Sequence, residues 1–184
     1  MLDQREDVAS IEALEDIIED KKFNKGMAYR NLQNYGHKVM WKNLLYGNNA
    51  RSRASFIFWL ACHERLATKY KLYKFSLTDN TTCYLCLQEE SIRQLLFECD
   101  TMKQIWMEVL QWVQVPHIPG NWHEETKWLV QQTKGKGMRA AILKMAAAET
   151  IYELWKNINN KSFGEPVDIT KIGKRIIDTL VYRG

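Results

Sequence analysis

Apolar residues recur at three- and four-residue steps along most of this 184-residue chain, which is the pattern of helices that each bury one face. The clearest case is the last one, where Ile169, Ile172, Ile176 and Leu180 share a face and Asp168 is placed to cap the start. Only three prolines and nine glycines are present, fewer than an all-β protein with many tight turns needs. The predicted fold class is therefore all-α.

The same periodicity gives the bounds of the predicted helices, the fourth of which has Ser52 as its cap. They are 2–20, a shorter piece within 26–36, then 39–46, 52–70, 90–97, 100–114, 122–133, 138–160 and 169–182. The loop Pro116–Gly120 is the best boundary. We therefore expect an acidic amphipathic helix at 1–20, a cysteine-containing domain at 21–115 and a C-terminal helical unit at 121–184 packed on it.

The charge of the chain is unevenly distributed. Residues 1–20 hold eight acids and one base, so residues 21–184 keep 25 of the 26 bases and 14 of the 22 acids, a net charge of +11. A basic segment at 21–184 preceded by an acidic segment at 1–20 indicates a polyanion partner. The alternative is that both segments carry ordinary solvated surface charges. The charge alone leaves both readings open.

The sequence also limits where the protein works. No stretch approaches the ~20 apolar residues that cross a bilayer, and the charged first twenty residues are neither a secretory signal nor a transit peptide. Four cysteines are too few for a secreted disulfide scaffold of this length. We expect reduced thiols, a nuclear or cytoplasmic location and no membrane partner.

The sharpest local signal is the spacing Cys83-x2-Cys86-x7-Gln94-x4-Cys99. A Cys-x2-Cys turn presents two thiolates to one metal ion, and a following helix supplies the other two ligands of a tetrahedral zinc site. Gln94 stands where a Cys-Cys-His-Cys knuckle has its histidine. Either His63, the neighbouring Cys62 or water completes a zinc site, or the metal has been lost and the cysteines are packing residues.

The residues around this turn are similar to a known family. They are Trp59–Thr68, Cys83–Cys86, Glu90, Gln94–Cys99 and Trp106, with Lys22–Phe23, Trp41 and Tyr152–Trp155 in the same order further out. This series resembles the reverse-transcriptase zinc-binding domain of plant LINE-type (non-LTR) retrotransposons over roughly residues 21–165.

That resemblance implies a helical domain with a small zinc knuckle that helps to hold nucleic acid. The sequence departs from the family pattern at Gln94, which stands in place of the knuckle histidine. Because no polymerase precedes the domain in this sequence and no ribonuclease H follows, we expect a detached or domesticated fragment of a retroelement.

Cations and aromatic rings alternate along and beyond the predicted helix at 52–70. The candidate nucleic-acid contacts are Arg51, Arg53, Arg65, Lys69, Lys71, Tyr73 and Lys74, interleaved with Tyr70 and Phe75. Bases can stack on such rings while the cations meet phosphates. The alternative is that the rings pack inward and the cations are solvated.

No catalytic group emerges from the sequence. The acids near the knuckle are better explained as helix caps and surface charges than as metal ligands of a nuclease; they are Glu89, Glu90, Glu98 and Asp100. Cys62 and His63 are adjacent on a predicted helix and point about 100° apart, so they do not pair. We predict non-enzymatic binding of RNA or single-stranded DNA, with no small-molecule substrate. The alternative is a protein-binding adaptor that kept the scaffold.

Overall fold

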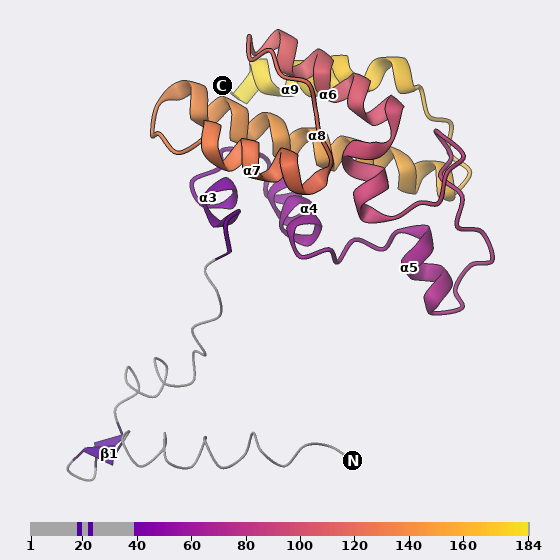
Figure 1. The fold of residues 1–184 in the computed structure, drawn as a ribbon, viewed down its shortest axis with the longest axis horizontal. Helices are drawn as coiled ribbons and strands as arrows, with labels where there is room; N and C mark the ends of the chain where they lie inside the picture. The colour runs from indigo at the N-terminus through magenta and orange to yellow at the C-terminus, as the bar shows by residue number, and fades with distance from the viewer. Residues whose placement is uncertain (1–17, 20–21, 24–38, 184) are drawn as a thin grey trace. The chain divides into compact units, whose positions relative to one another are not determined.

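The computed structural model describes residues 18–19, 22–23 and 39–183. The chain from Met40 onward forms one compact unit, and residues 1–39 belong to another. Figure 1 shows the helices of the compact unit. The predicted piece within 26–36 and residues 2–17 of the predicted acidic helix lie outside the described residues.

The described part of the first unit is a pair of short antiparallel strands, β1 (Ile18–Glu19) and β2 (Lys22–Phe23). Ile18 lies opposite Phe23 and Glu19 opposite Lys22, so a two-residue connection joins the strands. Residues paired in antiparallel strands have an extended backbone and are not part of a helix. The predicted helix over 2–20 is therefore wrong at Ile18–Glu19.

The all-α prediction is confirmed for the compact unit. In chain order its elements are α3 (Lys42–Leu45), α4 (Ser52–Cys62), α5 (Lys69–Lys74), the π-helical turn η1 (Gln94–Glu98), α6 (Asp100–Trp112), α7 (Trp122–Gln132), α8 (Met138–Ser162), the 3₁₀ turn η2 (Ile169–Lys171) and α9 (Ile172–Arg183). Within residues 39–183, strand-like pairing is confined to one bridge between Thr82 and Glu89. None of the described helices is long and apolar enough to cross a membrane.

The long helix α8 is the centre of the compact unit. It packs against α4 on one side and against α9 and α6 on the other, as Figure 1 shows. The consecutive residues Ala146, Ala147 and Ala148 are all at most 1% exposed. Because successive residues of a helix point about 100° apart, α8 is covered on most of its circumference here. Alanine lets the neighbouring helices approach closely.

The predicted helix over 52–70 is wrong beyond α4, because the chain turns out of the helix at Glu64. Glu64 takes a left-handed backbone conformation with φ of 51°. Its N–H donates to the carbonyl of Ala61 at 2.9 Å, and the N–H of Arg65 donates to the carbonyl of Leu60 at 2.8 Å. These two bonds form the Schellman motif that ends many helices.

Candidate metal centre and basic groove

Cys83 and Cys86, the first two cysteines of the predicted knuckle, lie in a tight loop. The N–H of Cys83 donates to the carbonyl of Gln88 at 2.7 Å, and the N–H of Leu87 donates to the carbonyl of Cys83 at 3.1 Å. Leu87 has a φ of 62°, the left-handed conformation that lets the loop close. The loop brings Cys83 and Cys86 toward the segment that carries the third cysteine.

The third cysteine follows the π-helical turn η1. The N–H of Cys99 donates to the carbonyl of Gln94 at 2.7 Å, which is the five-residue hydrogen bond of a π-turn. This bond puts Gln94 and Cys99 about one turn apart on the same side, whereas an α-helix would direct them about 140° apart. Cys99 also precedes the first residue of α6, where the positive end of the helix dipole favours a thiolate.

The loop and the turn bring three sulfur atoms together. The Sγ atoms of Cys83, Cys86 and Cys99 all lie within 4.8 Å of one another. A tetrahedral zinc ion with Zn–S bonds of 2.3 Å separates its sulfurs by about 3.8 Å. The three cysteines are therefore close enough to hold a metal ion, and the donor set is one that zinc accepts.

The thiol of Cys99 donates a hydrogen bond to the sulfur of Cys83. The hydrogen bond from the Cys99 thiol holds the pKa of Cys83 below its ordinary value. The same hydrogen bond raises the pKa of Cys99. Both residues are fully buried, so their hydrogen-bonded pair is shielded from water.

Gln94 closes the remaining side of the cluster. Its side chain is buried, with 6% exposed, and its Nε2 lies 2.7 Å from the Sγ of Cys86. Its Oε1 is also buried and has no hydrogen-bond partner. The residue that replaces the expected histidine thus lies beside the sulfurs.

The other two residues proposed as a fourth ligand lie elsewhere. The ring of His63 packs edge-on against Trp41 and Trp59, with centroids 4.8 and 4.7 Å away. Cys62 is on α4, where burial raises the pKa of its thiol to about 12. In the described part of the chain, the group able to hold a metal contains neither residue.

Fold and site together define a helical protein with a three-cysteine, knuckle-like centre. Residues 23–106 match the family described as zinc-binding in reverse transcriptase. The resemblance is therefore confirmed at the level of this zinc-binding domain, over the segment that carries all three clustered cysteines. No curated protein and no solved structure matches the chain.

Two of the seven candidate nucleic-acid residues are bound to other parts of the fold. The guanidinium of Arg51 is held by Glu149 and Glu153, at 2.8 Å from Nε and 2.9 Å from Nη2. Lys69 is buried, donates from Nζ to the carbonyl of Thr82, and lies 3.2 Å from the ring centre of Tyr84. Both cations therefore act within the fold rather than as free surface charges.

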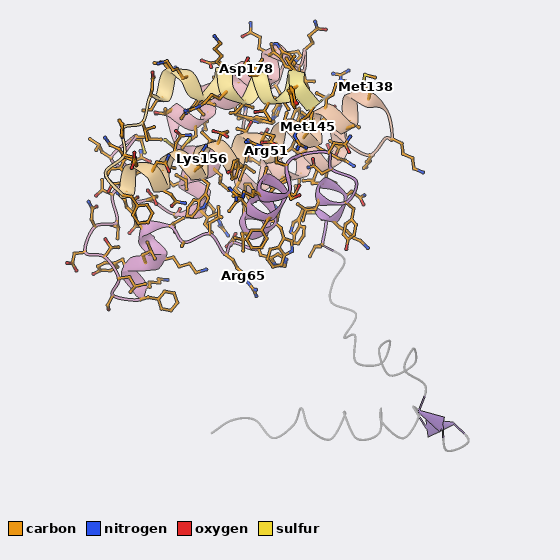
Figure 2. All side chains as sticks on the ribbon, turned by 180° about the vertical axis from the view of Figure 1, so that it is seen from behind. Arg51, Arg65, Met138, Met145, Lys156 and Asp178 are labelled. Atoms are coloured by element: carbon orange, nitrogen blue, oxygen red, sulfur yellow. The ribbon has the colours of Figure 1, made fainter. Side chains whose placement is uncertain are left out.

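The other candidates lie at or near the surface. Arg53, Arg65, Tyr73 and Lys74 are exposed, and Lys71 is half-buried. Figure 2 shows Arg65 at the edge of the compact unit, whereas Arg51 lies among its helices. Exposure leaves these five side chains accessible to a partner.

Lys71 and Lys74 share an open groove of about 410 Å³ between α5 and residues 91–93, which directly precede η1. Its lining residues are Glu64, Thr68, Tyr70, Lys71, Lys74, Phe75, Ser91, Ile92 and Arg93. Arg93 is exposed and was missed by the sequence analysis, although its position next to Gln94 places it beside the metal centre. The aromatic ring of Phe75 is 67% exposed. The groove therefore combines an accessible ring with three cations, of which Arg93 forms an exposed ion pair with Glu64 at 3.3 Å.

Proposed function

We propose that this protein is a non-enzymatic nucleic-acid-binding module that holds single-stranded RNA or DNA in the groove beside its cysteine cluster. The observation that carries the proposal is the meeting of Lys71, Lys74 and Arg93 with the exposed ring of Phe75 in one groove. Phosphates bind to such cations, and a base stacks on an exposed ring without needing a particular sequence.

The metal centre has a structural role in this proposal. Zinc held by Cys83, Cys86 and Cys99 fixes the loop to η1, and therefore fixes the position of Arg93 at the wall of the groove. The loop is also tied to α5, because the N–H groups of Lys69 and Tyr70 donate to Glu90 at 3.0 and 3.2 Å. A bound metal thus orders both sides of the groove.

The family match supports descent from a retroelement, and the order of motif residues supports a plant LINE-type source. All four cysteines are free thiols. We place the protein in the nucleus or cytoplasm, where thiols stay reduced and nucleic acid is available.

The test is fluorescence anisotropy with labelled single-stranded RNA, single-stranded DNA and duplex DNA over a salt series. A triple variant of the groove, Lys71→Gln, Lys74→Gln and Arg93→Gln, is compared with a charge-matched control. The control changes exposed lysines of α7 and the following loop: Lys127→Gln, Lys134→Gln and Lys136→Gln.

We expect single strands to bind better than duplex, with an affinity that falls steeply as salt rises. The groove variant should bind at least about ten-fold more weakly, and its salt slope should shrink by about two, because three phosphate contacts are lost. Equal weakening by both triple variants, or no binding to any strand at low salt, contradicts the proposal.

A second surface favours the alternative of a protein-binding module. An open groove of about 780 Å³ is lined by residues that include Met107, Gln111, His117 and Ile118. Ile118 is 85% exposed and Met107 is 39% exposed, so the groove presents apolar side chains to solvent. Failure to bind nucleic acid at low salt, together with a stable protein partner, would support this alternative.

A further inference from the structure

The fourth side of the cysteine cluster is occupied by a side chain that can itself bind a metal. We propose that Gln94 supplies its amide oxygen, Oε1, as the fourth ligand of a zinc ion held by Cys83, Cys86 and Cys99. This inference deepens the metal-holding role proposed above and rests on it. It replaces the reading in which the missing histidine leaves the site one ligand short.

The backbone aims Gln94 at the sulfurs. The π-turn puts residues 94 and 99 on the same side of the chain, and the N–H of Gln94 is fixed by the Oγ of Ser91 at 3.1 Å. The side chain is buried and its terminal amide lies 2.7 Å from the Sγ of Cys86. These contacts hold Gln94 beside the cluster.

The amide oxygen lacks a partner. Oε1 of Gln94 is buried and accepts no hydrogen bond, which is a costly state for a polar atom. Rotation of the terminal amide by 180° exchanges its oxygen and nitrogen without moving the rest of the side chain. Oε1 then takes the position of Nε2 beside the Sγ of Cys86, in place of the N–H···S hydrogen bond. Zinc accepts an oxygen ligand of this kind.

The chemistry of the residues around the site favours this assignment. In the described ranges, no histidine or carboxylate joins the three cysteines in the group able to hold a metal. Gln is neutral, as a zinc-bound imidazole is, so three thiolates and Zn²⁺ keep the same net charge with either ligand. An amide oxygen binds zinc less strongly than imidazole, so the site should hold zinc more loosely than a Cys₃His site.

The experiment uses the full chain loaded with Co²⁺, whose absorption reports both the number of thiolates and the nature of the fourth ligand. Wild type is compared with Gln94→Ala, Gln94→His and the control Gln88→Ala, whose side chain is exposed in the same loop. Zinc affinity is measured in parallel by competition with a chromophoric chelator, and circular dichroism shows that each variant is folded.

We expect tetrahedral Co²⁺ with three thiolates in wild type and in the Gln88→Ala control. Gln94→Ala should keep the thiolate charge-transfer bands, shift the visible bands and bind zinc about ten-fold more weakly or worse. Gln94→His should give visible bands that differ from those of both wild type and Gln94→Ala, and it should bind zinc about ten-fold more tightly than wild type. Visible bands that are identical in Gln94→Ala and wild type would overturn the proposal, because water would then be the fourth ligand.

A second measurement on the wild type does not depend on any variant folding. Zinc is titrated into ¹³C-labelled protein, and the side-chain carbonyl resonance of Gln94 is followed beside that of Gln88. A shift confined to Gln94 supports ligation by its oxygen, and no shift overturns it. Zinc binding by Gln94→His alone overturns it as well. Nucleic-acid binding is measured separately by anisotropy, so failure of the ligand assignment is distinct from failure of the proposed function.

Discussion

Arg51 donates hydrogen bonds to both oxygens of the buried Glu149 carboxylate. Its backbone N–H donates to Oε1 and its Nε donates to Oε2, each at 2.8 Å. The Glu149 side chain is fully buried, and Glu153 accepts from the same guanidinium at 2.9 Å. This contact joins the start of α4 to the middle of α8, and it explains why the predicted cap Ser52 lies inside the helix: Arg51 takes the cap position, with no side-chain capping bond.

Replacing Arg51 by alanine should destabilise the fold by about 3 kcal/mol, because it leaves the buried Glu149 carboxylate without its cation. The free energy of unfolding is measured in urea by circular dichroism. The control is Arg53→Ala, an exposed cation of the same helix, which should change the stability by no more than about 0.5 kcal/mol. Equal stabilities of the two variants would show that the ion pair contributes nothing.

Most helices of the compact unit could be predicted from apolar periodicity, but not all of their ends. Five helices of the compact unit, α3, α4, α5, α6 and α8, are followed by a residue with positive φ two positions after their last residue. Only after α3 and α8 is that residue a glycine, Gly47 and Gly164. The others are Glu64, Ser76 and Gln114, at φ of 51°, 55° and 57°. Without a glycine, the sequence carries no local sign of the left-handed turn, since the stop depends on how the next segment packs.

The cysteine cluster was predictable because its ligands lie within one short segment whose spacing is itself the signal. Which cations pair within the fold and which line the groove could not be predicted from the sequence. Arg51 pairs with Glu149, a residue 98 positions away, and no local pattern announces such a partner. The groove cation Arg93 was missed for the same reason: it is distant in sequence from the lysines of α5, and only the folded chain brings them to one groove.

Asn121 and Glu124 form a reciprocal cap at the start of α7. The Asn121 side chain accepts from the N–H groups of His123 and Glu124 at 3.0 and 3.1 Å, and the Glu124 side chain accepts from the N–H of Asn121 at 3.0 Å. Asn121→Ala should lower the free energy of unfolding by about 1 kcal/mol, because two N–H groups lose their acceptor. Asn121→Ser keeps an acceptor and should restore most of the loss in the same urea titration. A stability of Asn121→Ala equal to wild type would show that water replaces the cap.

Glu125 is a fully buried carboxylate that bonds two side chains, Trp106 Nε1 at 2.7 Å and His117 Nε2 at 2.8 Å. Glu125→Leu should destabilise the protein by about 1–3 kcal/mol more than Glu125→Gln does, because the amide can still accept from the indole and leucine cannot. Thermal unfolding of both variants checks the difference. If leucine is tolerated as well as glutamine, the buried N–H of Trp106 has found another acceptor.

The Cys62 thiol should make the fold sensitive to alkali. Burial raises its pKa to about 12, well above the ordinary value of about 8.5 that the unfolded chain has. The folded state therefore keeps a proton that the unfolded state releases, and stability is fully present below about pH 8.5. As pH rises from there toward 12, this group should lower the free energy of unfolding by roughly 1 kcal/mol per pH unit.

The measurement is urea unfolding at pH 8, 9 and 10, with a reductant and a chelator present so that the other thiols stay free. Wild type is compared with Cys62→Ala, and the quantity that matters is the slope of stability against pH rather than its value at one pH. Alanine removes the titrating group, so the variant should start less stable, because it leaves a small cavity, and then lose less with each pH unit. Parallel slopes in the two proteins would mean that the folded state lets Cys62 ionise as freely as the unfolded chain does.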